Sequence, residues 1–223
     1  MKLEELIVGN IVILDTSALW GVGKSIVEVL YSGRKGLNSL RRDEIEFHHS
    51  VVEEIEKIAG NHRMLWINEV VEEMRRFMNI INQQTEFIKK FSDDDNYDKI
   101  ELLDNYCDRF YRLLKKAKNS DLREKFSLEQ QNKYAQIIEE IEKIPERTSE
   151  SEINRERLKK HYPLGKILRT DEKIIATAFT LLYDEPVSVI TRDKNMIENI
   201  SQLYIHINPP YQLGLINRDV LPK

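Results

Sequence analysis

The sequence lacks several features that would assign it to a class of protein at once. Its 223 residues include a single cysteine, Cys107, so an internal disulfide is excluded, and no Cys/His spacing suggests zinc. No apolar run approaches the length of a membrane span, and residues 1–5 do not form the start of a signal peptide. We therefore expect a cytoplasmic protein without a membrane partner.

Net positive charge is also missing. The formal charge of −4 weighs against a protein that binds any polyanion, although it leaves room for local basic patches. The apolar share of 41% and the charged share of 32% fit a globular chain with a highly charged surface. No internal repeat and no linker rich in glycine and serine suggests two independent domains. The length allows one domain with a well-buried core, or one domain that carries a large insertion.

The pattern of expected strands and helices changes twice along the chain. We expect strands at 11–14, 187–191 and 204–207, a short extended segment at 45–47, and helices at 24–30, 51–59, 170–183 and 194–200. From about residue 65 to residue 160 only helical patterns are found. Alternating strands and helices favour a parallel sheet.

We accordingly predict an α/β fold with a central parallel sheet flanked by helices and interrupted by a helical insertion. Residues 1–62 would form the first part of the α/β domain, residues 63–162 the insertion, and residues 163–223 the second part with a C-terminal tail.

Asp15 follows four branched apolar residues that are typical of a strand buried on both faces. The carboxyl ends of parallel strands are where ligands and metals bind, and a buried charge there needs compensation. Asp15 could equally cap the turn into the next helix.

Glu54 must be separated from its neighbour Glu53. Ser50 and Glu53 match a capping box, which assigns Glu53 a structural role. On the expected helix, Glu54 lies at the border of the apolar face that contains Val52 and Ile55. It is a candidate for a site between helix and sheet, or simply a solvated acid.

Asp171 and Asp193 complete a set of four acids. Asp171 continues the apolar stripe of Ile175, Ala178 and Leu182, and its alternative role is to accept free amides at a helix start. Asp193 follows the strand at 187–191 and could also cap the next helix. Clustered carboxylates repel one another, and a hard cation such as Mg²⁺ or Mn²⁺ relieves that repulsion. The matching chemistry is metal-assisted hydrolysis of phosphodiesters.

At these residues the sequence resembles the PIN-domain nuclease family. The motifs are Leu14-Asp15-Thr16-Ser17-Ala18-Leu19, Ser50-Val51-Val52-Glu53-Glu54-Ile55, Thr170-Asp171-Glu172-Lys173-Ile174-Ile175-Ala176-Thr177-Ala178 and Val189-Ile190-Thr191-Arg192-Asp193-Lys194-Asn195-Met196. They occur in family order and cover about half of the chain. The long helical segment between the second and third acids departs from compact members of the family.

The resemblance implies a metal-dependent endoribonuclease, with RNA as the substrate and Mg²⁺ or Mn²⁺ as the cofactor. The acids that match the metal-binding positions are Asp15, Glu54, Asp171 and Asp193. Ser17 and Thr191 match polar positions beside them, and Lys24 and Arg192 are further candidates for contact with the substrate.

Two other readings stay open. Residues 18–25 end in Gly23-Lys24-Ser25 and match a relaxed phosphate-loop pattern, which would make the protein a nucleotide-binding switch, but Leu19 and Trp20 are bulky for such a loop. The chain could also be a catalytically weak scaffold whose insertion binds RNA, a regulatory protein or a second copy. Aromatic and basic residues alternate at 109–116, which suits either RNA contact or an amphipathic helix that buries Phe110, Leu113 and Leu114.

Overall fold

The fold is built on a sheet of four strands, and their parallel arrangement is the one that the sequence predicts. The computed structural model describes residues 3–18, 34–90, 97–117, 122–143 and 170–217. The strands stand in the order β2-β1-β3-β4. Their bounds are β1 (Ile11–Leu14), β2 (Arg63–Leu65), β3 (Val187–Thr191) and β4 (Leu213–Asn217). The α/β class with a central parallel sheet is therefore confirmed.

Strands β1 and β3 form the centre of the sheet. Every residue of both strands is buried, as expected for branched apolar runs that are covered on two faces. Leu14 pairs with Ile190 in the register of the two strands. Asp15, which follows β1, and Thr191, the last residue of β3, therefore lie side by side.

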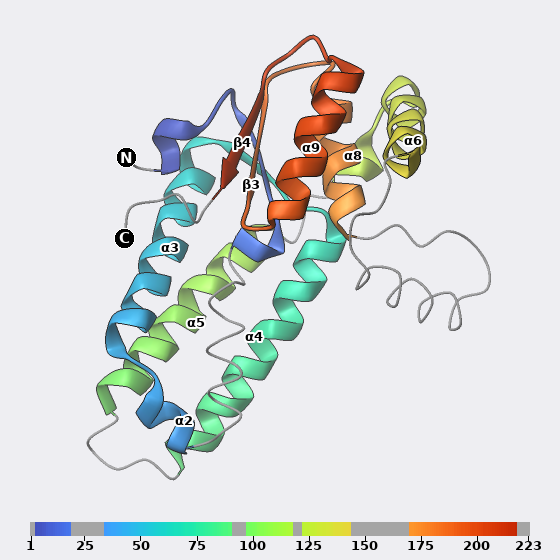
Figure 1. Cartoon of the computed structure of the whole chain (residues 1–223). Helices are drawn as coiled ribbons and strands as arrows, with labels where there is room; N and C mark the ends of the chain where they lie inside the picture. Colours follow the sequence, from blue (N-terminus) through green and yellow to red (C-terminus); the bar gives the residue numbers. More distant parts are fainter. Residues whose placement is uncertain (1–2, 19–33, 91–96, 118–121, 144–169, 218–223) are drawn as a thin grey trace, which may run out of the picture.

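Helices cover the sheet and extend beyond its carboxyl edge (Figure 1). Their bounds are α2 (Arg34–Ser39), α3 (Arg42–Asn61), α4 (Asn68–Lys89), α5 (Tyr97–Ala117), α6 (Leu128–Lys143), α8 (Thr170–Leu181) and α9 (Lys194–Ile207), with short 3₁₀ helices η1 (Leu3–Leu6) and η3 (Leu122–Lys125). The long helices α3, α4 and α5 pack together, α8 and α9 lie against β3 and β4, and α6 packs on α8.

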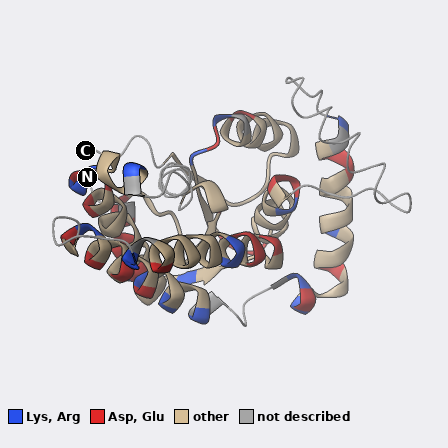
Figure 2. Ribbon diagram, turned by 90° about the horizontal axis from the view of Figure 1, so that it is seen from below, with Lys and Arg blue, Asp and Glu red and all other residues tan. Residues whose placement is uncertain are grey.

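One apolar core runs from the sheet into the bundle of α3, α4 and α5. Within the bundle, Phe110 is 1% exposed and packs against Phe77 and Tyr106, with ring centroids 5.9 and 5.8 Å apart. Leu113 and Leu114 are also buried. The amphipathic-helix reading of residues 109–116 is thus confirmed. Figure 2 shows acidic and basic residues interspersed along the outer faces of the helices.

Helix α3 corrects two predictions. Residues 45–47 are helical rather than extended, because Ile45, His48, Val52 and Ile55 are buried along one continuous helical face. Ser50 is not an N-cap: it lies inside α3, where its hydroxyl donates to the carbonyl oxygen of Phe47 at 2.6 Å.

The helix begins earlier, after Arg41, whose backbone N–H donates to the carboxylate of Glu44 at 3.2 Å. The short apolar segment did not distinguish strand from helix by its period alone.

The end of the chain also differs from the prediction. Residues 204–207 continue α9 instead of forming a strand, since Leu203, Tyr204 and Ile207 extend its apolar face. The strand β4 lies further on, in the segment predicted to be the C-terminal tail. Strand β2 was not predicted either, because it has only three residues and one of them is charged.

The remaining element predictions agree well with the fold. Strands β1 and β3 have the predicted bounds, and α8 covers most of the predicted helix at 170–183. The predicted helix at 24–30 lies outside the described residues. The three-part division of the chain stays a prediction, although β2 places the first residues of the proposed insertion in the sheet. None of the described helices combines enough length and apolar character to cross a membrane.

Candidate functional site

Asp15 stands at the carboxyl end of the central strand and is 4% exposed. Its backbone N–H donates to the carbonyl oxygen of Ile190 at 3.0 Å, which continues the pairing of β1 with β3 by one residue. Its side chain is therefore held at the edge of the sheet by the same ladder that builds the core.

Two hydroxyls converge on one oxygen of this carboxylate. Thr191 donates to Asp15 Oδ2 at 2.7 Å, and the hydroxyl of Ser17 donates to the same oxygen. The two hydroxyl oxygens are 3.1 Å apart. Ser17 also accepts the backbone N–H of Arg192 at 2.9 Å. The predicted polar positions Ser17 and Thr191 thus lie together and orient Asp15.

Asp193 belongs to the same group of residues. Its backbone N–H donates to the hydroxyl of Thr191 at 3.0 Å, and its Oδ1 accepts the N–H of Met196 at 3.3 Å. The second contact caps the start of α9, so the structural role considered for Asp193 is confirmed. The capping bond leaves Asp193 close enough to Asp15 for the two carboxylates to repel.

The electrostatics of Asp15 are unfavourable for an ionised carboxylate. Burial raises the pKa of Asp15, and the charge of Asp193 raises it further, while hydrogen bonds from Ser17 and Thr191 act in the opposite direction. The net result is a raised pKa. A carboxylate in this position carries an electrostatic cost that a bound cation would remove.

A carboxylate that the sequence reasoning passed over connects the site to Asp171. Glu73, in the second turn of α4, accepts the hydroxyl of Thr16 at 2.7 Å and the hydroxyl of Thr170 at 2.9 Å. Thr16 directly follows Asp15, and Thr170 directly precedes Asp171. Glu73 therefore ties the end of β1 to the first turn of α8, where Asp171 lies.

The sequence contained a signal for Glu73. It lies between Val70, Met74 and Phe77, which form a buried stripe on the helix after β2. Its spacing places Glu73 at the border of this stripe, where its side chain is exposed.

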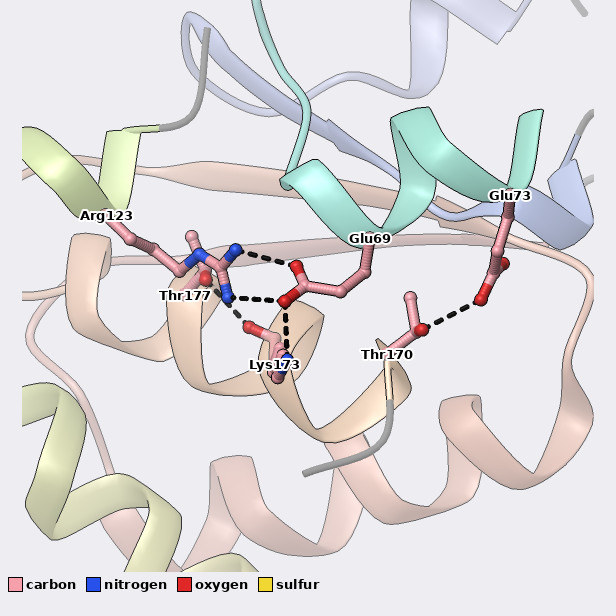
Figure 3. A network of polar contacts seen from close by, with 6 residues as sticks. All are labelled: Glu69, Glu73, Arg123, Thr170, Lys173 and Thr177. Atoms are coloured by element: carbon pink, nitrogen blue, oxygen red, sulfur yellow. Dashed lines mark hydrogen bonds and ion pairs between the residues drawn. The ribbon is translucent and has the colours of Figure 1, made fainter. Parts of the chain in front are cut away.

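A second network lies one turn earlier on α4 (Figure 3). Glu69 accepts hydrogen bonds from Lys173 of α8 and from Arg123 of η3, with 2.6 Å between Arg123 Nη2 and Glu69 Oε2. Burial by itself would raise the pKa of Glu69, but these hydrogen bonds outweigh it and leave the pKa lowered. Glu69 and Glu73 together fasten α4 to α8 beside the candidate site.

Glu54 is placed differently from the other predicted acids. It is half-buried on α3 beside the buried residues Val51 and Ile55, as its border position predicts. Lys24 and the phosphate-loop pattern lie outside the described residues.

The residues present suit a hard cation in type but do not enclose one. Carboxylate and hydroxyl oxygens are the donors that Mg²⁺ and Mn²⁺ prefer. Within the described ranges, however, no three His, Cys, Asp or Glu side chains are arranged to hold one metal ion. The four-carboxylate site of Asp15, Glu54, Asp171 and Asp193 stays a prediction.

Comparison with known proteins adds no assignment: no family model, curated protein or solved structure matches the chain.

Proposed function

We propose that this protein is a metal-dependent ribonuclease whose active site lies at the carboxyl edge of the sheet. The observation that carries the proposal is the buried carboxylate of Asp15, held by two hydroxyls at the end of the central strand and repelled by Asp193. Burial of such a charge costs stability unless it is compensated, and groups with a raised or lowered pKa cluster at functional sites. The resemblance of the surrounding motifs to PIN-domain nucleases supplies the reaction.

The metal-holding acids in this proposal are Asp15, Asp171 and Asp193, together with Glu73. We favour Glu73 over Glu54 as the fourth acid, since hydrogen bonds connect Glu73 to the residues beside Asp15 and Asp171. A bound Mg²⁺ or Mn²⁺ would supply an activated water and neutralise charge that develops on the phosphate.

The hydroxyls of Ser17 and Thr191 hold Asp15 Oδ2 in one orientation. Arg192 and Lys24 remain candidates for contact with substrate phosphate. A cytoplasmic location is part of the same proposal.

The test is cleavage of a single-stranded RNA in Mn²⁺ by the wild type and by Asp15→Asn. The amide oxygen of asparagine can still accept both hydroxyls, so the variant should fold. We expect a loss of at least about 100-fold in rate, because removal of residues that only support metal ligands already costs 10–100-fold. Asp108→Asn makes the same chemical change at an exposed position on α5 and should retain full activity. Equal cleavage by the wild type and Asp15→Asn would refute the mechanism.

One observation favours a second candidate, a catalytically weak scaffold that binds RNA or protein. Both oxygens of Glu73 are already used by threonine hydroxyls, and no metal-binding group is formed in the described part of the chain. This alternative predicts RNA or protein binding that requires neither Mn²⁺ nor Asp15.

A further inference from the structure

An open cleft of about 410 Å³ lies between the start of α4, η3 and α6. This volume falls in the range of pockets that hold small organic ligands. The residues that line it are Asn68, Arg123, Glu124, Phe126, Gln131 and Tyr134. None of the residues assigned above to the metal site belongs to this lining.

The charges of the lining are balanced. The guanidinium of Arg123 is held by Glu69, with both of its terminal nitrogens within hydrogen-bond reach of that carboxylate. Glu124 adds a negative charge to the lining. A phosphate in this cleft would meet no surplus of positive charge, so the cleft suits a neutral group better than an anion.

Two aromatic rings form an apolar wall. The ring of Tyr134 is half-buried, and the buried Phe126 supports it with 6.1 Å between the ring centroids and 56° between the planes. Gln131 donates to the carbonyl oxygen of Phe126 at 2.9 Å, which fixes the orientation of its amide. A flat group on Tyr134 would therefore find a polar amide beside it. That combination of stacking surface and hydrogen-bonding groups fits a nucleobase.

The cleft is adjacent to the proposed active site. Asn68, in its lining, begins α4, and Glu73 follows five residues later, about 7.5 Å along the helix axis. Arg123 lines the cleft and contacts Glu69, which in turn contacts Lys173 of α8 (Figure 3). The wall of the cleft and the acids at the sheet edge thus share the first two turns of α4.

We propose that this cleft receives an unpaired nucleobase of the substrate RNA, stacked on Tyr134, from a nucleotide near the phosphate that is cleaved. The proposal rests on the proposed function for its substrate. It makes the enzyme selective for single-stranded RNA, because a base inside a duplex cannot enter the cleft.

The test measures binding of fluorescent oligonucleotides by anisotropy in EDTA, where cleavage is prevented. Two probes of equal length are compared, oligouridine and a fully abasic oligomer with the same backbone. Tyr134→Ala should weaken oligouridine binding about tenfold, in line with one lost base–aromatic stack, and leave abasic binding unchanged. Tyr134→Phe keeps the ring and should bind as the wild type does.

Tyr97→Ala removes an exposed tyrosine at the start of α5 and serves as the matched control, with no change expected. Circular dichroism establishes that each variant is folded. The proposal is overturned if wild type binds both probes equally, or if Tyr134→Ala weakens both by the same factor. Either result would leave a partner's aromatic side chain as the better occupant.

Cleavage of the abasic oligomer in Mn²⁺ separates this proposal from the proposed function. This oligomer has no ring to stack on Tyr134, so Tyr134→Ala should slow cleavage of oligouridine far more than cleavage of the abasic oligomer, whereas Asp15→Asn should abolish both. If the wild type cleaves neither oligomer, the nuclease proposal loses support. The anisotropy result still decides whether the cleft binds a nucleobase. If cleavage requires Asp15 but Tyr134→Ala binds oligouridine as tightly as the wild type does, only the nucleobase site is refuted.

Discussion

Charged side chains are placed differently in two regions of the molecule, the carboxyl edge of the sheet and the bundle of α3, α4 and α5. In the bundle, Phe77, Tyr106 and Phe110 fill the interior, and charged side chains pair at the outer faces, as Glu56 does with Arg109. At the sheet edge, the carboxylate of Asp15 is buried with hydroxyls as its partners and a second carboxylate nearby. The bundle is arranged for stability, whereas the edge keeps an unfavourable charge, which the proposed metal site would compensate.

The largest expected effect tests the bundle side of this comparison. Phe110→Ala should lower the free energy of unfolding by about 3–5 kcal/mol, because a large, fully buried ring is replaced by a cavity. Chemical denaturation measures it. Tyr111→Ala, at the neighbouring exposed position, is the control and should cost far less. Similar costs for both variants would mean that the bundle is not packed as described.

The next effect tests which helix acid serves the site. Glu73→Gln should slow Mn²⁺-dependent RNA cleavage about 10–100-fold, since one threonine hydroxyl loses its acceptor and a negative charge is removed. Glu54→Gln makes the same change on α3 and should have little effect. If Glu54→Gln slows cleavage and Glu73→Gln does not, Glu54 is the fourth acid, as the sequence predicts.

A smaller effect concerns the cost of the buried charge. The pKa of Asp15 is raised in the folded protein, so its contribution to stability is full at low pH and is lost as the pH rises through that folded pKa. Asp15→Asn does not titrate. Without metal, its melting temperature should therefore exceed that of the wild type, by a margin that grows from acidic to neutral pH.

Thermal unfolding across this pH range measures the margin, and added Mn²⁺ should reduce it by stabilising the wild type alone. A margin independent of pH would show that Asp15 is not the titrating group.

The smallest effect tests the surface charges. Arg42 and Glu46 form an exposed ion pair of 2.8 Å on α3. Glu46→Gln should change the free energy of unfolding by no more than about 0.5 kcal/mol, and 1 M salt should remove the difference. A cost above 1 kcal/mol would contradict the view that these outer charges contribute little.

The predictions from sequence succeeded where a pattern was local and complete. The buried runs that became β1 and β3 and the stripe after Asp171 have unambiguous periods, and they placed Asp15 and Asp193 at strand ends. They failed where a segment was short. Residues 45–47 suit either strand or helix alone, and β2 is recognised only by its pairing with β1.

The sequence by itself determined the parallel α/β class and the position of Asp15 at the end of a buried strand, because both follow from local runs of apolar residues. Only the tertiary structure decided which side chains reach that carboxylate. Thr191, at the end of β3, lies 176 residues from Asp15 in the sequence, and the sheet register brings the two together. Glu73 accepts hydrogen bonds from Thr16 and Thr170, which lie far apart in the sequence. Such contacts depend on how distant elements pack, and no local pattern encodes that packing.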